Sequence, residues 1–238
     1  MGELSAGMGL LDDIAGETGS ATSTDPVSAV GVKYRDALRL LFILAAGSDP
    51  ADDPAEECVK VFRAEKRLMA MDFLVRYPDY LADALLDVVE AEGDLDLLKK
   101  VEGIFDADEP SVRLVRMVRW KRGAYENIAD ALALLSYYGL VRSMQLKGED
   151  GKVRRYEYQI SSKAMAFLDQ CVADHPDLVW YRDRMTLVMR VASGKSGSKL
   201  KDWQYEHPTY GKTLHGDLIP SIRVEVEKRL RAISENLK

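Results

Sequence analysis

Hydrophobic positions recur at helical spacing along most of the chain. Between residues 33 and 46, the apolar side chains that share one helical face are Ala37, Leu38, Leu41, Phe42 and Ala45. Similar patterns predict further helices over 62–76, 79–90, 95–105, 111–121, 124–138, 161–172, 177–192 and 220–237. Pro78 separates the first two of these, and Ser161 or Ser162 offers an N-cap for the helix that begins there. The chain is therefore predicted to be mainly α.

One segment alternates polar and apolar residues instead, which is the period of a β-strand. The alternation covers 142–147 and 152–160, and the residues between them, Gly-Glu-Asp-Gly, tolerate the positive φ of a hairpin turn. The predicted helix 124–138 leads directly into this segment. A helix followed by a two-stranded ribbon is typical of a winged helix. We therefore expect a small β-hairpin in a winged-helix core over about 111–172, with additional helices around it.

Composition divides the chain into three parts. Residues 1–31 are rich in Gly, Ser, Thr and Ala, and they predict a flexible N-terminal tail. Residues 32–192 predict an α-rich domain that contains the winged helix, although a two-lobed arrangement with a break at 92–108 fits the same pattern. Residues 193–238 begin with a basic linker at 194–199, continue through an aromatic corner, and end in a helix that we expect to pack on the core.

Charge is distributed unevenly. The chain has a net charge of −6, but residues 110–163 contain eleven Lys or Arg and five Asp or Glu, a local excess of +6. The cations in and near the predicted winged helix are Arg113, Arg116, Arg119, Lys121, Arg122, Lys147, Lys152, Arg154 and Arg155. They are candidates for contact with a nucleic-acid backbone or an acidic partner, because such contacts need charge without base geometry. An ordinary solvated surface would give the same pattern.

The predicted helix 124–138 contains no Lys or Arg, whereas a helix that reads bases in the major groove normally carries them. Sequence-specific reading by this helix is therefore not expected. Aromatic residues point to protein contacts instead, and the candidate interface residues are Tyr137, Trp203, Tyr205 and Tyr210. The last three would equally serve to attach the C-terminal helix to the core.

The chain shows no pattern typical of catalysis. Gly194-Lys195-Ser196 and Gly211-Lys212-Thr213 lack the earlier glycine of a phosphate-binding loop. The three histidines have no spacing typical of a metal site, so no metal or cofactor is expected. Two cysteines are too few for a disulfide framework, and no apolar run is long enough to span a membrane. We expect a cytoplasmic protein that is not an enzyme.

Residues 65–86 read EKRLMAMDFLVRYPDYLADALL. The residues that match a known pattern are Leu68, Met71, Asp72, Phe73, Leu74, Arg76, Tyr77, Pro78, Tyr80, Leu81 and Leu85, with Tyr205, Glu206, His207, Pro208 and Tyr210 near the other end. The chain resembles, over 33–238, the middle components of bacterial three-component ABC-ATPase systems, which overlap the small subunit of Lamassu-type anti-phage defence.

That resemblance implies a non-catalytic accessory subunit. Its partners would be an SMC- or Rad50-like coiled-coil ATPase and an effector, often a nuclease, with sequence-independent contact to DNA as a further expectation. Its winged helix would act like the small dimerising subunits of SMC complexes. The alternative is a free winged-helix transcription regulator, which would homodimerise on a palindromic site and carry cations on the helix 124–138.

Overall fold

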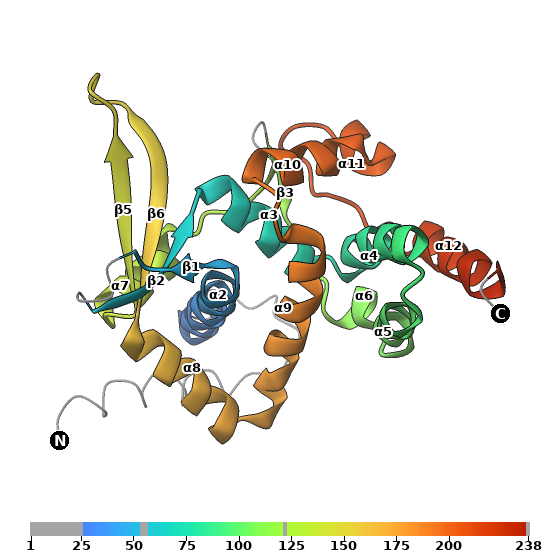
Figure 1. Ribbon diagram of the computed structural model, residues 1–238, viewed down its shortest axis with the longest axis horizontal. Helices are drawn as coiled ribbons and strands as arrows, with labels where there is room; N and C mark the ends of the chain where they lie inside the picture. Colours follow the sequence, from blue (N-terminus) through green and yellow to red (C-terminus); the bar gives the residue numbers. More distant parts are fainter. Residues whose placement is uncertain (1–25, 53–56, 121–122, 237–238) are drawn as a thin grey trace. The chain divides into compact units, whose positions relative to one another are not determined.

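The computed structural model describes residues 26–52, 57–120 and 123–236. It is mainly helical with a small antiparallel sheet, as predicted (Figure 1). The chain forms two compact units: unit 1 comprises residues up to 65 together with 127–183, and unit 2 comprises 66–126 and 184–238. This division differs from the expected domain of residues 32–192, and from the alternative break at 92–108, because both units are assembled from segments distant in sequence.

Unit 1 contains the expected hairpin. Its elements are α2 (Pro26–Gly47), β1 (Asp49–Pro50), β2 (Cys58–Arg63), α7 (Ala129–Tyr137), β5 (Val141–Lys147), β6 (Val153–Ser161), α8 (Ser162–Asp174), η1 (Pro176–Leu178) and the start of α9 (Val179–Ala192). Helix α2 begins at Pro26, so the prediction that order starts at residue 32 was wrong. The rest of the expected tail, residues 1–25, lies outside the described residues. Ser161 is the N-cap of α8, as predicted, and its hydroxyl accepts from the Ala164 N–H.

The sheet of unit 1 has the strand order β1-β2-β6-β5, with all neighbours antiparallel. The hairpin β5–β6 is confirmed, and Figure 1 shows it extending away from the helices of unit 1. One face of the sheet is buried, where the rings of Phe62 and Tyr158 lie 6.3 Å apart. The register places Met144 opposite Glu157 and Ser143 opposite Tyr158, so Met144 and Tyr158 lie on opposite faces of the sheet.

The core around the hairpin is not continuous in sequence. Its elements follow the order α2, β2, α7, β5, β6, and residues 66–126 of unit 2 intervene between β2 and α7. Pairing of β2 with β6 brings the N-terminal helix to the hairpin. The core therefore does not run over 111–172. The predicted helix 124–138 was also too long, because α7 begins at Ala129 while residues 123–125 form a strand of unit 2.

Unit 2 consists of short helices and one small ribbon. Its elements are α3 (Glu65–Arg76), α4 (Pro78–Glu92), α5 (Leu95–Asp106), α6 (Glu109–Val112), β3 (Val118–Trp120), β4 (Gly123–Tyr125), the end of α9, α10 (Gly197–Glu206), α11 (Pro208–Lys212) and α12 (Arg223–Asn236). The predicted helix 111–121 was wrong, since α6 ends at Val112 and β3 follows. The predicted linker 194–199 and the aromatic segment after it contain α10 and α11.

Helix α10 begins at a close approach of backbone to backbone. A Cβ atom added to Gly197 would lie 2.5 Å from the backbone nitrogen of Arg67, within the same unit. Only glycine fits there, because the neighbouring atoms are backbone and cannot rotate away. By contrast, a Cβ added to Gly103 of α5 would meet no atom within 4 Å.

We therefore expect Gly197→Ala to lower the free energy of unfolding by about 1–3 kcal/mol through overpacking. Gly103→Ala is the matched control and should raise it by about 0.5–1 kcal/mol, because alanine favours a helix interior. Urea denaturation followed by circular dichroism measures both. Equal effects of the two substitutions would contradict the close approach at Gly197.

Candidate functional site

The junction between α3 and α4 lies at the centre of unit 2. We call its five residues, Arg76, Tyr77, Pro78, Asp79 and Tyr80, the corner; all five are buried. Helix α3 ends at Arg76, and Pro78 opens α4, where its missing N–H and fixed φ suit the first turn.

Tyr77 bonds to two backbone segments that are distant in sequence. Its hydroxyl accepts a hydrogen bond from the Met117 N–H at 2.8 Å and donates to the Ile219 carbonyl at 3.0 Å. Burial raises the pKa of Tyr77 to about 12, because ionisation would place a charge in an apolar setting. The neutral hydroxyl is therefore held between these two segments at any ordinary pH.

Arg76 holds the chain just before β3. Its guanidinium donates to the carbonyls of Val115 at 2.9 Å and Arg116 at 3.0 Å. The same side chain forms ion pairs with Asp72 and with Glu126. A buried guanidinium needs such partners, because its desolvation is otherwise costly.

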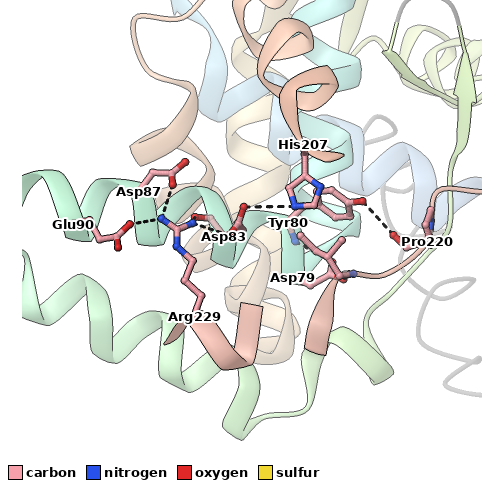
Figure 2. Close-up of polar contacts among 9 residues, drawn as sticks. Asp79, Tyr80, Asp83, Asp87, Glu90, His207, Pro220 and Arg229 are labelled. Carbon is pink, nitrogen blue, oxygen red and sulfur yellow. Dashed lines mark hydrogen bonds and ion pairs between the residues drawn. The ribbon is translucent and has the colours of Figure 1, made fainter. Parts of the chain in front are cut away.

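Asp79 and Tyr80 hold the segment that leads into α12. The Asp79 carboxylate accepts from the Ser221 hydroxyl at 2.6 Å and from the Ile222 N–H at 2.7 Å. Burial raises the pKa of Asp79, although these hydrogen bonds act in the opposite direction. The Tyr80 hydroxyl donates to the Pro220 carbonyl at 3.3 Å (Figure 2).

Three acidic side chains along α4 are paired with a single arginine. Figure 2 shows the Arg229 guanidinium among the carboxylates of Asp83, Asp87 and Glu90. His207 lies 3.9 Å from Asp83, and its ring meets that of Tyr80 edge to face. This cluster attaches α12 to α4 and uses its carboxylates in ion pairs rather than in a cation site.

The arginines of the predicted helix 111–121 do not lie on a helix, because α6 ends at Val112 and Arg119 is in β3. Arg119 points inward: it donates to the Thr213 carbonyl and lies over the Tyr205 ring, 4.9 Å from the centroid. Arg113 and Arg116 are exposed. Lys121 and Arg122 lie outside the described residues. Arg119 is thus a packing residue and is a poor candidate for contact with a partner.

The predicted aromatic interface is mostly interior. Tyr210 is fully buried, and its ring packs against those of Phe73 and Tyr205. Trp203 and Tyr205 are half-buried, so these residues help to attach the C-terminal segment to the core of unit 2. Tyr210 is therefore corrected from an interface residue to a core residue. Tyr137, in unit 1, is 83% exposed.

The hairpin of unit 1, which we call the wing, carries the remaining predicted cations. Lys147, Lys152, Arg154 and Arg155 are all exposed near its tip. Arg154 pairs with Asp150 at 3.0 Å, and Arg155 pairs with Glu157 at 2.5 Å. Within the described part of the chain, no ion pair involves Lys147, and the Lys152 amine is 3.9 Å from Asp150.

A hollow of about 630 Å³ lies at the base of the wing. Two hydroxyls line it, but Ser136 donates to the Val141 carbonyl and Ser161 donates to the Gly139 carbonyl. Both hydroxyls therefore hold the backbone where β5 begins. The lining also contains two charged side chains of opposite sign, Glu57 and Arg142. The lining favours no single class of ligand.

Within the described ranges, no three His, Cys, Asp or Glu side chains are grouped to hold a metal ion. Nor does that part of the chain contain a helix whose length and apolarity would suit a bilayer crossing. Comparisons with protein-family models, curated proteins and solved structures found no match.

Two exposed residues were missed by the sequence analysis. Trp120 of β3 is 47% exposed and Tyr125 of β4 is 45% exposed. Trp120 fell inside the predicted helix 111–121, and Tyr125 inside the predicted helix 124–138. The available signal was Gly123, whose φ of +120° breaks any helix and allows the tight ribbon.

Tyr77→Phe should lower the free energy of unfolding by about 1–3 kcal/mol, because it removes a partner from a buried N–H and a buried carbonyl. Tyr137→Phe, at an exposed position, is the control. Urea denaturation at neutral pH measures the difference. An equal effect of the two variants would contradict the role of the Tyr77 hydroxyl.

The raised pKa of Tyr77 also predicts that the free energy of unfolding depends on pH. Below pH 10 tyrosine is neutral in both states, so the contribution of Tyr77 is fully present. Above its ordinary pKa of 10.0 the unfolded chain ionises while folded Tyr77, with a pKa of about 12, does not. Stability therefore falls as pH rises from 10 to 12, by about 3 kcal/mol for this residue. The stability advantage of wild type over Tyr77→Phe should therefore fall to about zero or reverse by pH 12, which urea denaturation across that pH range measures.

Proposed function

We propose that the chain is a non-catalytic accessory subunit of an SMC- or Rad50-like ATPase complex in anti-phage or anti-plasmid defence. In this proposal it docks on the ATPase, contacts an effector, and uses the wing to touch the nucleic-acid backbone. The observation that carries the proposal is the wing itself, a hairpin that leaves the helices of unit 1 and bears cations near its tip.

The form of the wing favours contact with a polyanion. Strand β5 is at the edge of the sheet, and of residues 142–147 only Met144 is even half-buried. Residues 141–161 contain five Lys or Arg and three Asp or Glu. Flexible cations at a protruding tip reach phosphates without a fixed orientation to the bases, so such a contact does not depend on sequence.

Helix α7 gives little support to the alternative, a free transcription regulator. The exposed positions of this helix are Ala129, Asp130, Ala133, Ser136 and Tyr137. Small side chains and a carboxylate offer few donors to base edges, and Asp130 repels phosphates. Its exposed tyrosine suits a protein contact better. We therefore place the ATPase contact at Tyr137.

The corner also supports a role as a subunit. The stretch that resembles the defence subunits uses Arg76, Tyr77 and Asp79 to hold backbone segments, and all three side chains are buried. A motif of this kind maintains a fold and has no reactive group open to a substrate. The nature of the effector rests on the resemblance alone.

The contact with the backbone predicts a salt-dependent loss in the double variant Lys147→Ala with Lys152→Ala. Its affinity for unrelated duplexes should fall equally, and the slope of log K against log salt should decrease by about 2. Fluorescence anisotropy on two duplexes of different sequence measures both quantities. Lys99→Ala, on α5 of unit 2, is the control. Loss for one duplex alone would favour the regulator instead.

Docking predicts a stable complex. Expression of the tagged chain with the genes that neighbour its own should recover a large coiled-coil ATPase in stoichiometric amount. Tyr137→Ala should release this ATPase while the melting temperature stays unchanged, because the side chain is exposed. Val224→Ala, 75% exposed in unit 2, is the control. Recovery of a homodimer alone would contradict docking.

A further inference from the structure

A small sheet surface in unit 2 is built from three chain segments. Strands β3 and β4 pair, and residues 217–219 run antiparallel to the other edge of β3. The Arg119 N–H donates to the Asp217 carbonyl, and the Ile219 N–H donates to the Met117 carbonyl. Val118 therefore has Tyr125 on one side and Leu218 on the other.

The two faces of this sheet differ in burial. Met117 and Ala124 are buried on the inner face, and Arg119 is half-buried there. On the outer face lie Val118, Trp120, Tyr125 and Leu218, of which the last three are 47%, 45% and 52% exposed. We call these four residues the outer face. Arg116 lies two residues before Val118, so the alternation of side chains along a strand places it on the same side, and it is exposed.

The two aromatic rings of the outer face are diagonal neighbours. Trp120 is directly opposite Gly123, and Tyr125 is two residues further along β4. Diagonal neighbours on one face of an antiparallel pair are about 7–8 Å apart. Gly123 itself is buried, with the side chains of Gln204 and Lys201 beside it. Trp120 and Tyr125 keep 47% and 45% of their surface exposed, at a spacing that can accommodate successive unstacked bases.

Cations and acids both lie near these rings. Arg113 and Arg116 are exposed and precede β3, whereas Arg119 points inward. Glu126, next to Tyr125, is paired with Arg76, and Asp217, next to Leu218, is exposed. Cations beside exposed aromatic rings are the combination that binds single strands, because the rings stack on bases and the cations track phosphates.

The outer face is also held rigidly from behind. The Tyr205 hydroxyl donates to the Trp120 carbonyl at 2.8 Å, and the Tyr77 hydroxyl bonds to both Met117 and Ile219. The backbone therefore needs no rearrangement before a ligand binds, which lowers the entropic cost of binding.

We propose that the outer face of unit 2 binds single-stranded nucleic acid, with one base stacked on Trp120, the next on Tyr125, and a phosphate beside Arg116. A duplex would not bind in this way, since its bases are already stacked on one another. The proposal goes beyond the function suggested for the wing and does not depend on it. The occupant that competes with it is an acidic segment of a protein.

The test uses the full chain and a labelled single-stranded DNA of mixed sequence, about 16 nucleotides long, beside a duplex of the same sequence. Trp120→Ala and Tyr125→Ala should each weaken binding of the single strand about 5- to 150-fold, as expected for the loss of one stacked base. Trp120→Phe should retain most of the affinity. Arg116→Ser should reduce the salt slope for the single strand by about 0.7.

The controls separate this surface from the wing. Trp120→Ala and Tyr125→Ala should leave duplex binding unchanged, whereas the double variant of Lys147 and Lys152 should weaken duplex binding. Tyr137→Ala should change neither, and melting temperatures establish that each variant is folded. Equal loss for both DNA forms in Trp120→Ala would overturn the stacking. Unchanged single-strand binding in that variant would assign the outer face to a protein partner and overturn the proposal.

Discussion

Unit 2 depends on hydrogen bonds between three corner side chains and groups far away in the sequence, most of which are backbone groups. Arg76, Tyr77 and Asp79 bond to residues 115–117 and 219–222. Some of these backbone groups, such as the Met117 N–H, are buried, where an unpaired polar group is costly. The corner satisfies them with rigid or buried side chains. The corner therefore holds residues 115–117 and 219–222 in place independently of the contacts that these two segments make with each other.

This constraint assigns a structural role to the polar side chains of the corner. These side chains hold distant chain segments, and three acids that follow along α4, Asp83, Asp87 and Glu90, pair with Arg229. The consequence for function is indirect. The corner and Tyr205 together support β3 from within the unit, which leaves Trp120 and Tyr125 on the outer face of the ribbon. The corner thus positions the outer face, although none of its own side chains belongs to that face.

The sequence predicted those features that local periodicity determines. It gave α4, α5, α8 and the hairpin nearly to the residue, because each has its own period and its own turn or cap. It failed at 111–121, where apolar residues fit a helix but the backbone bonds to Arg76 and Tyr77 instead. Pairing of β2 with β6 was also beyond local patterns. The sequence located the cations of the wing because they flank a recognisable turn. The outer face could not be predicted in this way, because it depends on how β3 pairs with β4 and with residues 217–219.

The charge of the chain limits how either surface can act. Under the two proposals, a net charge of −6 would repel nucleic acid at long range, so the cations near the wing and the outer face would act only at close approach. Few phosphates are neutralised, and the intrinsic affinity should therefore be low and sensitive to salt. Such a surface becomes effective when a partner already bound to nucleic acid raises its local concentration. Weak, sequence-independent contacts are thus more useful to a docked subunit than to a regulator that must find its site alone.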